Sequence, residues 1–156
     1  MRFLLIVILA GACSAVPAPQ QVRHLEYRYV AHYPRGPFTP GAAFHVDWIP
    51  ELVRSDPSEP YEVRLCIGVF GYFENPSALK EAGSRAGAAR PDCPPAGAVV
   101  SSGVLRTRSD TGEPLGVDLV LPHLVGFYDV REIAISGVEP TYSATAASGA
   151  IEIRGP

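Results

Sequence analysis

Apolar and polar residues alternate along most of this 156-residue chain. The segments that share the alternation are residues 24–32, 43–49, 61–69, 115–121 and 149–154. In each of them every second side chain is apolar, so one face of an extended strand is apolar and the other polar. This period of two is typical of antiparallel strands with one face in the core and one in solvent. The pattern therefore predicts five half-buried strands.

Two further segments are less regular. Residues 99–108 mix apolar and polar positions around Gly103, and residues 127–136 change parity at Arg131 and Glu132. A change of parity within one strand predicts a β-bulge at that point. Turns rich in Pro and Gly separate all of these segments. About seven short strands with such turns indicate an all-β fold, an Ig-like antiparallel β-sandwich.

Residues 71–97 are too long for a hairpin loop and predict an insertion. Asn75 is a good N-cap and Pro76 a good first helical residue, so residues 77–82 are expected to form about two helical turns. In the segment of residues 43–49, Trp48 follows the inward-facing alternation and is expected in the core.

Cys66 and Cys93 are expected to form a disulfide, because an even pair of thiols in an oxidising compartment pairs by default. A buried free thiol and a metal site are the alternatives, and neither Cys has a second Cys or a His close by in the sequence. Cys66 shares the outward parity of Glu62 and Arg64. Its partner must then come from outside the core, which predicts that the insertion folds back over the outer face of a sheet.

The first residues are typical of an export signal. A positive start, an apolar run at residues 3–10 and small residues at 11–15 predict a signal peptide of residues 1–15. Residues 16–22 are expected to be an extended leader, and residues 23–156 the folded domain. An alternative is a lipid-modified Cys13, which is the one case in which we expect a membrane attachment. Either alternative predicts an extracellular or cell-envelope location.

Charge and motifs argue against several function classes. Lys and Arg total 13 against 16 Asp and Glu, a net charge of −3 that disfavours nucleic acid as a partner. The triplet at residues 110–112, Asp-Thr-Gly, resembles that of aspartic proteases but lacks a second copy and an apolar frame, so a turn is expected. His45 and Asp47 share a strand face, and a solvated face is the expected interpretation. We expect no catalytic residues, no metal and no cofactor.

Three stretches resemble a known architecture. Residues 39–48, with a Pro-Gly turn leading to Trp48, resemble the opening of secreted Ig-like domains. Residues 121–128 resemble the approach to their penultimate strand, in which a corner tyrosine, here Tyr128, bonds back to the backbone. Residues 148–153 resemble their closing strand. The whole is similar to fungal necrosis-inducing secreted effectors, or to the Ig-like amino-terminal domain of yeast cell-wall synthesis proteins. A bacterial Ig-like lipoprotein is a further alternative.

The resemblance implies a non-catalytic role in which the protein binds another protein or a cell-wall polymer. We expect the insertion to provide the binding surface, through Phe70, Tyr72, Phe73 and Leu79. The alternative is that these side chains close the end of the core. A protease inhibitor, an enzyme and an envelope lipoprotein are the competing functional classes.

Overall fold

The computed structural model describes residues 24–56, 59–86, 91–137 and 143–155. The predicted signal peptide and leader lie outside the described residues. The elements are β1 (His24–His32), β2 (Ala43–Asp56), β3 (Glu62–Phe73), α1 (Pro76–Ala86), β4 (Val100–Ser101), β5 (Leu105–Arg108), β6 (Leu115–Val120), β7 (Gly126–Ser136) and β8 (Ser143–Ile153).

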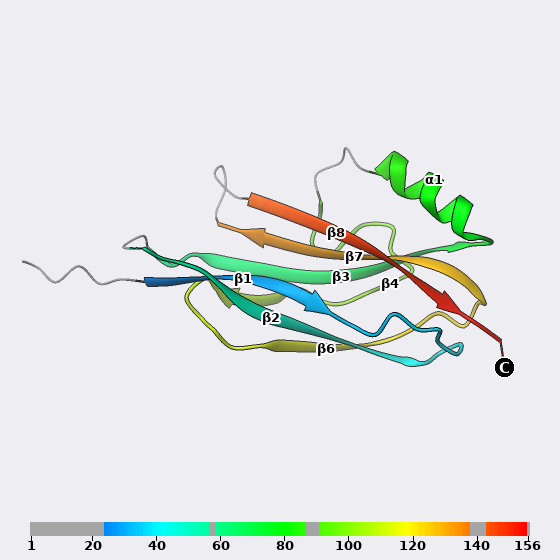
Figure 1. Cartoon of the computed structure of the whole chain (residues 1–156), viewed down its shortest axis with the longest axis horizontal. Helices are drawn as coiled ribbons and strands as arrows, with labels where there is room; N and C mark the ends of the chain where they lie inside the picture. The colour runs from blue at the N-terminus through cyan, green and yellow to red at the C-terminus, as the bar shows by residue number, and fades with distance from the viewer. Residues whose placement is uncertain (1–23, 57–58, 87–90, 138–142, 156) are drawn as a thin grey trace, which may run out of the picture.

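The strands form two antiparallel sheets that face each other (Figure 1). One sheet, here called sheet A, has the order β1-β2-β6. The other, sheet B, has the order β4-β3-β7-β8, with β5 also paired to β3. In this order β1, β2 and β6 take the places of strands A, B and E of an Ig-like sandwich. β3, β7 and β8 take the places of its strands C, F and G. The predicted all-β sandwich is confirmed.

The core lies between the two sheets. It contains Phe44, Val46 and Trp48 from β2 and the inward side chains of β3, β7 and β8. Trp48 is 2% exposed, which confirms its predicted place in the core. The alternation that is visible in the sequence thus corresponds to burial at residues 43–49 of β2, whereas β3 is buried on both faces from Leu65 to Val69.

The irregular segment at residues 99–108 forms two strands instead of the one that we predicted. β4 and β5 both pair with β3, but residues 102–104 lie opposite residues 66–67. The chain therefore carries one residue more than it can pair. Ser102 takes over the contact with β3, because its Oγ accepts a hydrogen bond from the N–H of Ile67 at 3.0 Å. The sandwich accordingly has eight strands within the described residues.

The β-bulge predicted at Arg131 and Glu132 is wrong. The register between β3 and β7 runs without a shift across both residues, from Val63↔Ser136 to Phe70↔Asp129. The parity changes in the sequence because both faces of β7 are covered there. Tyr128 and Val130 belong to the core, whereas Ile133 and Ile135 pack on the outer face.

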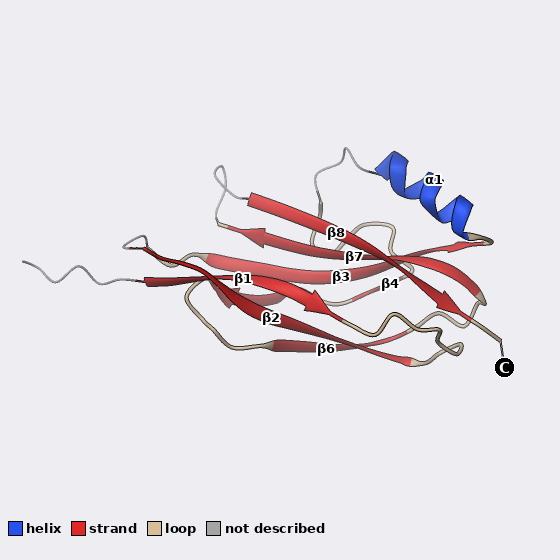
Figure 2. Cartoon of the chain, viewed as in Figure 1, coloured by secondary structure: helices blue, strands red, loops and turns tan. Residues whose placement is uncertain are grey.

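The insertion covers that outer face. Cys66 is fully buried, forms a disulfide with Cys93, and packs with Ile133 and Ile135. Helix α1 contacts β3 and β7 on the side of sheet B away from sheet A (Figure 2). Its N-cap is Asn75, whose Oδ1 accepts a hydrogen bond from the N–H of Ala78 at 2.9 Å. The predicted disulfide, the outer-face position of Cys93 and the helix start are confirmed, and the helix is longer than the predicted turns.

Candidate functional site

Three exposed apolar side chains gather at one end of the sandwich. Tyr72 at the end of β3 is 48% exposed, and Leu124 and Val125 in the loop before β7 are 56% and 51% exposed. The end of β3 and the loop before β7 lie close together at Gly126, where a Cβ would be 3.0 Å from Cδ2 of Tyr72. We call Tyr72, Leu124 and Val125 the end patch. An exposed apolar cluster of this kind marks a surface suited to a partner.

A hydrogen bond fixes the loop that carries Leu124 and Val125. The Tyr128 hydroxyl donates to the carbonyl oxygen of Leu124 at 2.7 Å, which is the backbone bond predicted for a corner tyrosine. Burial, and secondly the neighbouring phenol of Tyr72, raise the pKa of Tyr128. The phenol therefore keeps the proton with which it holds the loop.

The four residues predicted for binding have different environments. Tyr72 is exposed, whereas Phe70, Phe73 and Leu79 are half-buried. The guanidinium of Arg131 lies 4.1 Å from the ring centroid of Phe70, in cation–π geometry. Phe73 is paired with Phe127 across β3 and β7.

Sequence reasoning did not identify Leu124 and Val125 as candidate binding residues. Two adjacent apolar residues between Pro122 and Gly126 were the available signal. Pro and Gly at the two ends of this segment predict a turn there. Two apolar residues in a turn have no strand face to bury them, so their exposure follows from their place in the chain.

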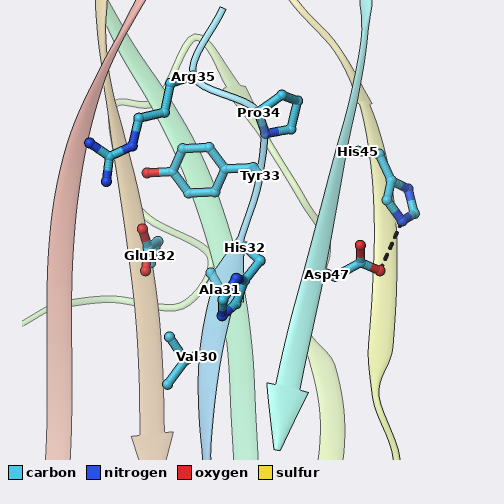
Figure 3. Close-up of a pocket in the computed structure, with 9 residues that line it drawn as sticks. All are labelled: Val30, Ala31, His32, Tyr33, Pro34, Arg35, His45, Asp47 and Glu132. Carbon is cyan, nitrogen blue, oxygen red and sulfur yellow. Dashed lines mark hydrogen bonds and ion pairs between the residues drawn. The ribbon is translucent and has the colours of Figure 1, made fainter.

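A cleft lies where β1 ends (Figure 3). The cleft has a volume of about 540 Å³. Its lining residues are Val30, Ala31, His32, Tyr33, Pro34, Arg35, His45, Asp47 and Glu132. Six of them are consecutive from Val30 to Arg35, so the cleft follows the end of β1 and the residues after it.

Tyr33 and Glu132 meet at the inner side of this cleft. A Cβ at Gly149 of β8 would lie 2.6 Å from the Tyr33 hydroxyl, so the ring reaches from β1 to the inner face of sheet B. Burial raises the pKa of Tyr33, and the charge and hydrogen bonding of the Glu132 carboxylate raise it further. The phenol therefore stays protonated beside a carboxylate.

On the outer face of sheet A, His45 lies between two carboxylates. Its Nδ1 is 2.7 Å from Asp118 Oδ1, and its Nε2 is 3.0 Å from Asp47 Oδ1. Hydrogen bonds that the carboxylates of Asp118 and then Asp47 accept from the ring raise the pKa of His45. Within the ranges that the structure describes, no group of three His, Cys, Asp or Glu side chains has a metal-holding arrangement.

The Asp-Thr-Gly triplet holds a paired carboxylate. Arg108 Nε donates to Asp110 Oδ1 at 3.0 Å, and this hydrogen bond lowers the pKa of Asp110. The N–H of Thr111 also donates to the carbonyl of Arg108 at 3.1 Å, which closes a turn. An ionised carboxylate neutralised by Arg108 lacks the shared proton on which aspartic proteases depend.

No protein-family model, curated protein or solved structure matches the chain. Of the helical residues that the structure describes, none form a helix long and apolar enough to cross a membrane.

Proposed function

We propose that the protein is an extracellular, non-catalytic binding module that engages a partner protein through the end patch. The observation that carries the proposal is the exposed cluster of Tyr72, Leu124 and Val125 on a frame of fixed strands. Aromatic side chains with apolar neighbours provide most of the binding energy in many protein interfaces.

The frame favours binding because its side chains need little further ordering. The Tyr128 hydroxyl donates a hydrogen bond to the carbonyl of Leu124 at 2.7 Å, and the ring of Tyr72 lies against Gly126, where a Cβ would be 3.0 Å from Cδ2. A surface that is ordered before binding loses less conformational entropy when the partner arrives. Tyr72 therefore has the position of an anchor, with Leu124 and Val125 beside it.

The disulfide supports an extracellular location. Cys66 is fully buried beneath the insertion and bonded to Cys93. Such bonds form and persist in oxidising compartments and are rare in the cytosol. Export is tested by mass spectrometry of the mature amino terminus from the native host, together with thiol titration. A start at Val16 with no free thiol supports secretion, a lipidated Cys13 indicates an envelope lipoprotein, and a retained residue 1 with reduced Cys66 and Cys93 contradicts export.

The binding test replaces Tyr72 by a photo-reactive phenylalanine analogue in the mature chain and cross-links it to native surface and secreted proteins. The captured protein is then purified, and its affinity is measured for wild type and for Tyr72→Ala. We expect affinity to fall by at least about tenfold, because an aromatic anchor is lost. Purified chitin, glucan and peptidoglycan are assayed in parallel, and binding to one of these polymers alone contradicts a protein partner.

A matched control comes from the opposite end of the sandwich. Leu52 and Val53 near the end of β2 are 60% and 55% exposed, similar to the end patch. The double variant Leu52→Ser, Val53→Ser should keep its affinity, whereas Leu124→Ser, Val125→Ser should lose it. Equal losses in both variants, or a collapse of the melting temperature in Tyr72→Ala, would show that these side chains are structural.

A further inference from the structure

The inner face of sheet B is wider than sheet A can cover. Sheet A has three strands, whereas sheet B places β7 and β8 beyond β3. Thr145 and Ala147 of β8 are paired with Ala134 and Glu132 of β7. Residues paired in this way share a face, and Ala134 packs on the core, so all of them face inward. Thr145 and Ala147 are nevertheless exposed, so none of the described strands of sheet A covers them.

Strand β1 ends sheet A beside this uncovered region, and its backbone has a free edge. Tyr29 of β1 lies opposite Pro50, which has no N–H, so this pair cannot be a hydrogen-bonded one. The N–H of Leu121 donates to the carbonyl of Ala42 at 2.9 Å. The N–H and C=O groups of even-numbered residues in β2 are therefore directed toward β6. Even-numbered Trp48 is the partner of Ala31 in β1.

It follows from the alternation of antiparallel ladders that Tyr29 and Ala31 direct N–H and C=O away from β2. Near the start of β1 this edge is in use, since the N–H of Tyr27 donates to the carbonyl of Ser109 at 2.7 Å. At Ala31 the edge opens into the cleft of about 540 Å³, on the side of Glu132 (Figure 3). An edge of this kind is a template for a further strand.

Glu132 gives the cleft a chemical preference. It is the inward-facing partner of Ile67, a core residue, and so a carboxylate occupies a position that is normally apolar. Glu132 is half-buried, and its neighbour in the cleft is the Tyr33 phenol. The cation next to it in the chain, Arg131, is paired with Asp129 at 2.7 Å instead. Burial of a carboxylate is unfavourable without a cationic partner. His32 and Arg35 line the cleft too, but both are exposed to solvent.

We propose that this cleft binds an extended segment of another protein, which adds to the free edge of β1 as a fourth strand of sheet A. The backbone of the segment pairs with Ala31, and one of its inward side chains, a Lys or Arg, reaches Glu132 beside the Tyr33 ring. The added strand covers Thr145 and Ala147. This mode of recognition combines main-chain hydrogen bonds for affinity with one side-chain pocket for specificity.

A second copy of the chain is the competing occupant. Pairing of β1 with another β1 would place inward-facing tyrosines, among them Tyr27 and Tyr29, over β8 and would offer Glu132 no cation at matching positions. A heterologous basic segment fits the charge of the cleft better. The two occupants are distinguishable, because self-pairing changes the mass in solution and a bound peptide does not double it.

The test is a selection of random displayed peptides on the mature protein, followed by affinity measurement with the selected synthetic peptides. We expect alternating sequences with one invariant Lys or Arg. Replacing that residue by Glu should weaken binding at least about tenfold, and Glu132→Lys should reverse this preference. Asp118→Asn, which changes a carboxylate on the outer face of sheet A that does not line the cleft, and Tyr72→Ala, which changes the end patch, should bind as the wild type does.

Two measurements report on the backbone. Ala31→Pro removes the edge N–H without removing a bond to β2 and should abolish binding. Amide hydrogen exchange of the wild type provides the same information without a substitution, since Ala31 should become protected when the peptide binds. Selection of no binding peptide, selected peptides without a basic preference, an unchanged Ala31 exchange rate, or a dimer that protects Ala31 without peptide would each overturn the proposal. Loss of partner binding at the end patch alone would leave it standing.

Discussion

Gly149 of β8 lies directly beneath the hydroxyl group of Tyr33, and a Cβ at Gly149 would be 2.6 Å from that oxygen. Gly149→Ala must therefore displace the ring from the cleft. We expect a loss of about 1 kcal/mol in the free energy of unfolding, which is the lower end for an overpacked site because the ring end can move. Urea denaturation measures the loss.

The matched control for this substitution is Gly83→Ala. Gly83 is helical, and a Cβ there would meet no atom within 4 Å. Ala in an exposed helix is favoured over Gly by about 0.8–1.0 kcal/mol, so this variant should be more stable than the wild type. Two Gly→Ala changes with effects of the same sign would contradict the geometry described for Tyr33.

Removal of the Tyr128 hydroxyl should loosen the end patch. Tyr128→Phe keeps the buried ring but leaves the carbonyl of Leu124 without its donor, which lies at 2.7 Å. We expect a cost of about 0.5–1.5 kcal/mol in thermal or urea unfolding. Faster amide exchange at Leu124 and Val125 should accompany it. Unchanged exchange in this loop would indicate that other contacts order the patch.

The disulfide should contribute strongly to stability. Cys66 and Cys93 are 27 positions apart, and the chain-entropy model gives about 3.5 kcal/mol for a loop of that length. The double variant Cys66→Ala, Cys93→Ala should lose free energy of unfolding of this order. The single variants serve as controls, because each loses the same disulfide and leaves one cysteine as a free thiol. A loss below about 1 kcal/mol would indicate that the insertion is ordered mainly by packing.

The stability of the outer face should depend on pH through His45. Asp118 and Asp47 raise its pKa above the ordinary 6.5. The folded state therefore binds the proton more tightly than the unfolded state. The resulting stabilisation is fully present below pH 6.5 and is lost as the pH rises through the raised folded value.

This contribution is to be measured as the difference in free energy of unfolding between the wild type and His45→Asn, at pH values from below 6.5 to above the raised pKa of His45. The difference should be larger at acid than at alkaline pH. Salt at about 1 M should reduce it, because exposed ion pairs are screened. A difference that is independent of pH would contradict the role of His45.

Much of the fold could be predicted from the sequence because it depends on local patterns. A period of two in residues 43–49 and 61–69 places Trp48 in the core and Cys66 on the outer face. Asn75 before Pro76 predicts the start of α1, and the Gly-x-Tyr at Tyr128 predicts its hydrogen bond to the backbone. Each of these features is set by residues close together in the chain.

The two candidate surfaces depend on contacts between distant segments. Tyr72 lies beside Gly126, the residue that follows Leu124 and Val125, only because β3 and β7 are paired. Glu132 opens to the cleft only because sheet A stops at β1. For the same reason the change of parity in β7 does not mark a β-bulge, because the insertion covers the outer face of this strand. The sequence by itself determined which faces of the strands are apolar. The tertiary structure decided what covers each face, because sheet width, register and the path of the insertion are set by long-range packing.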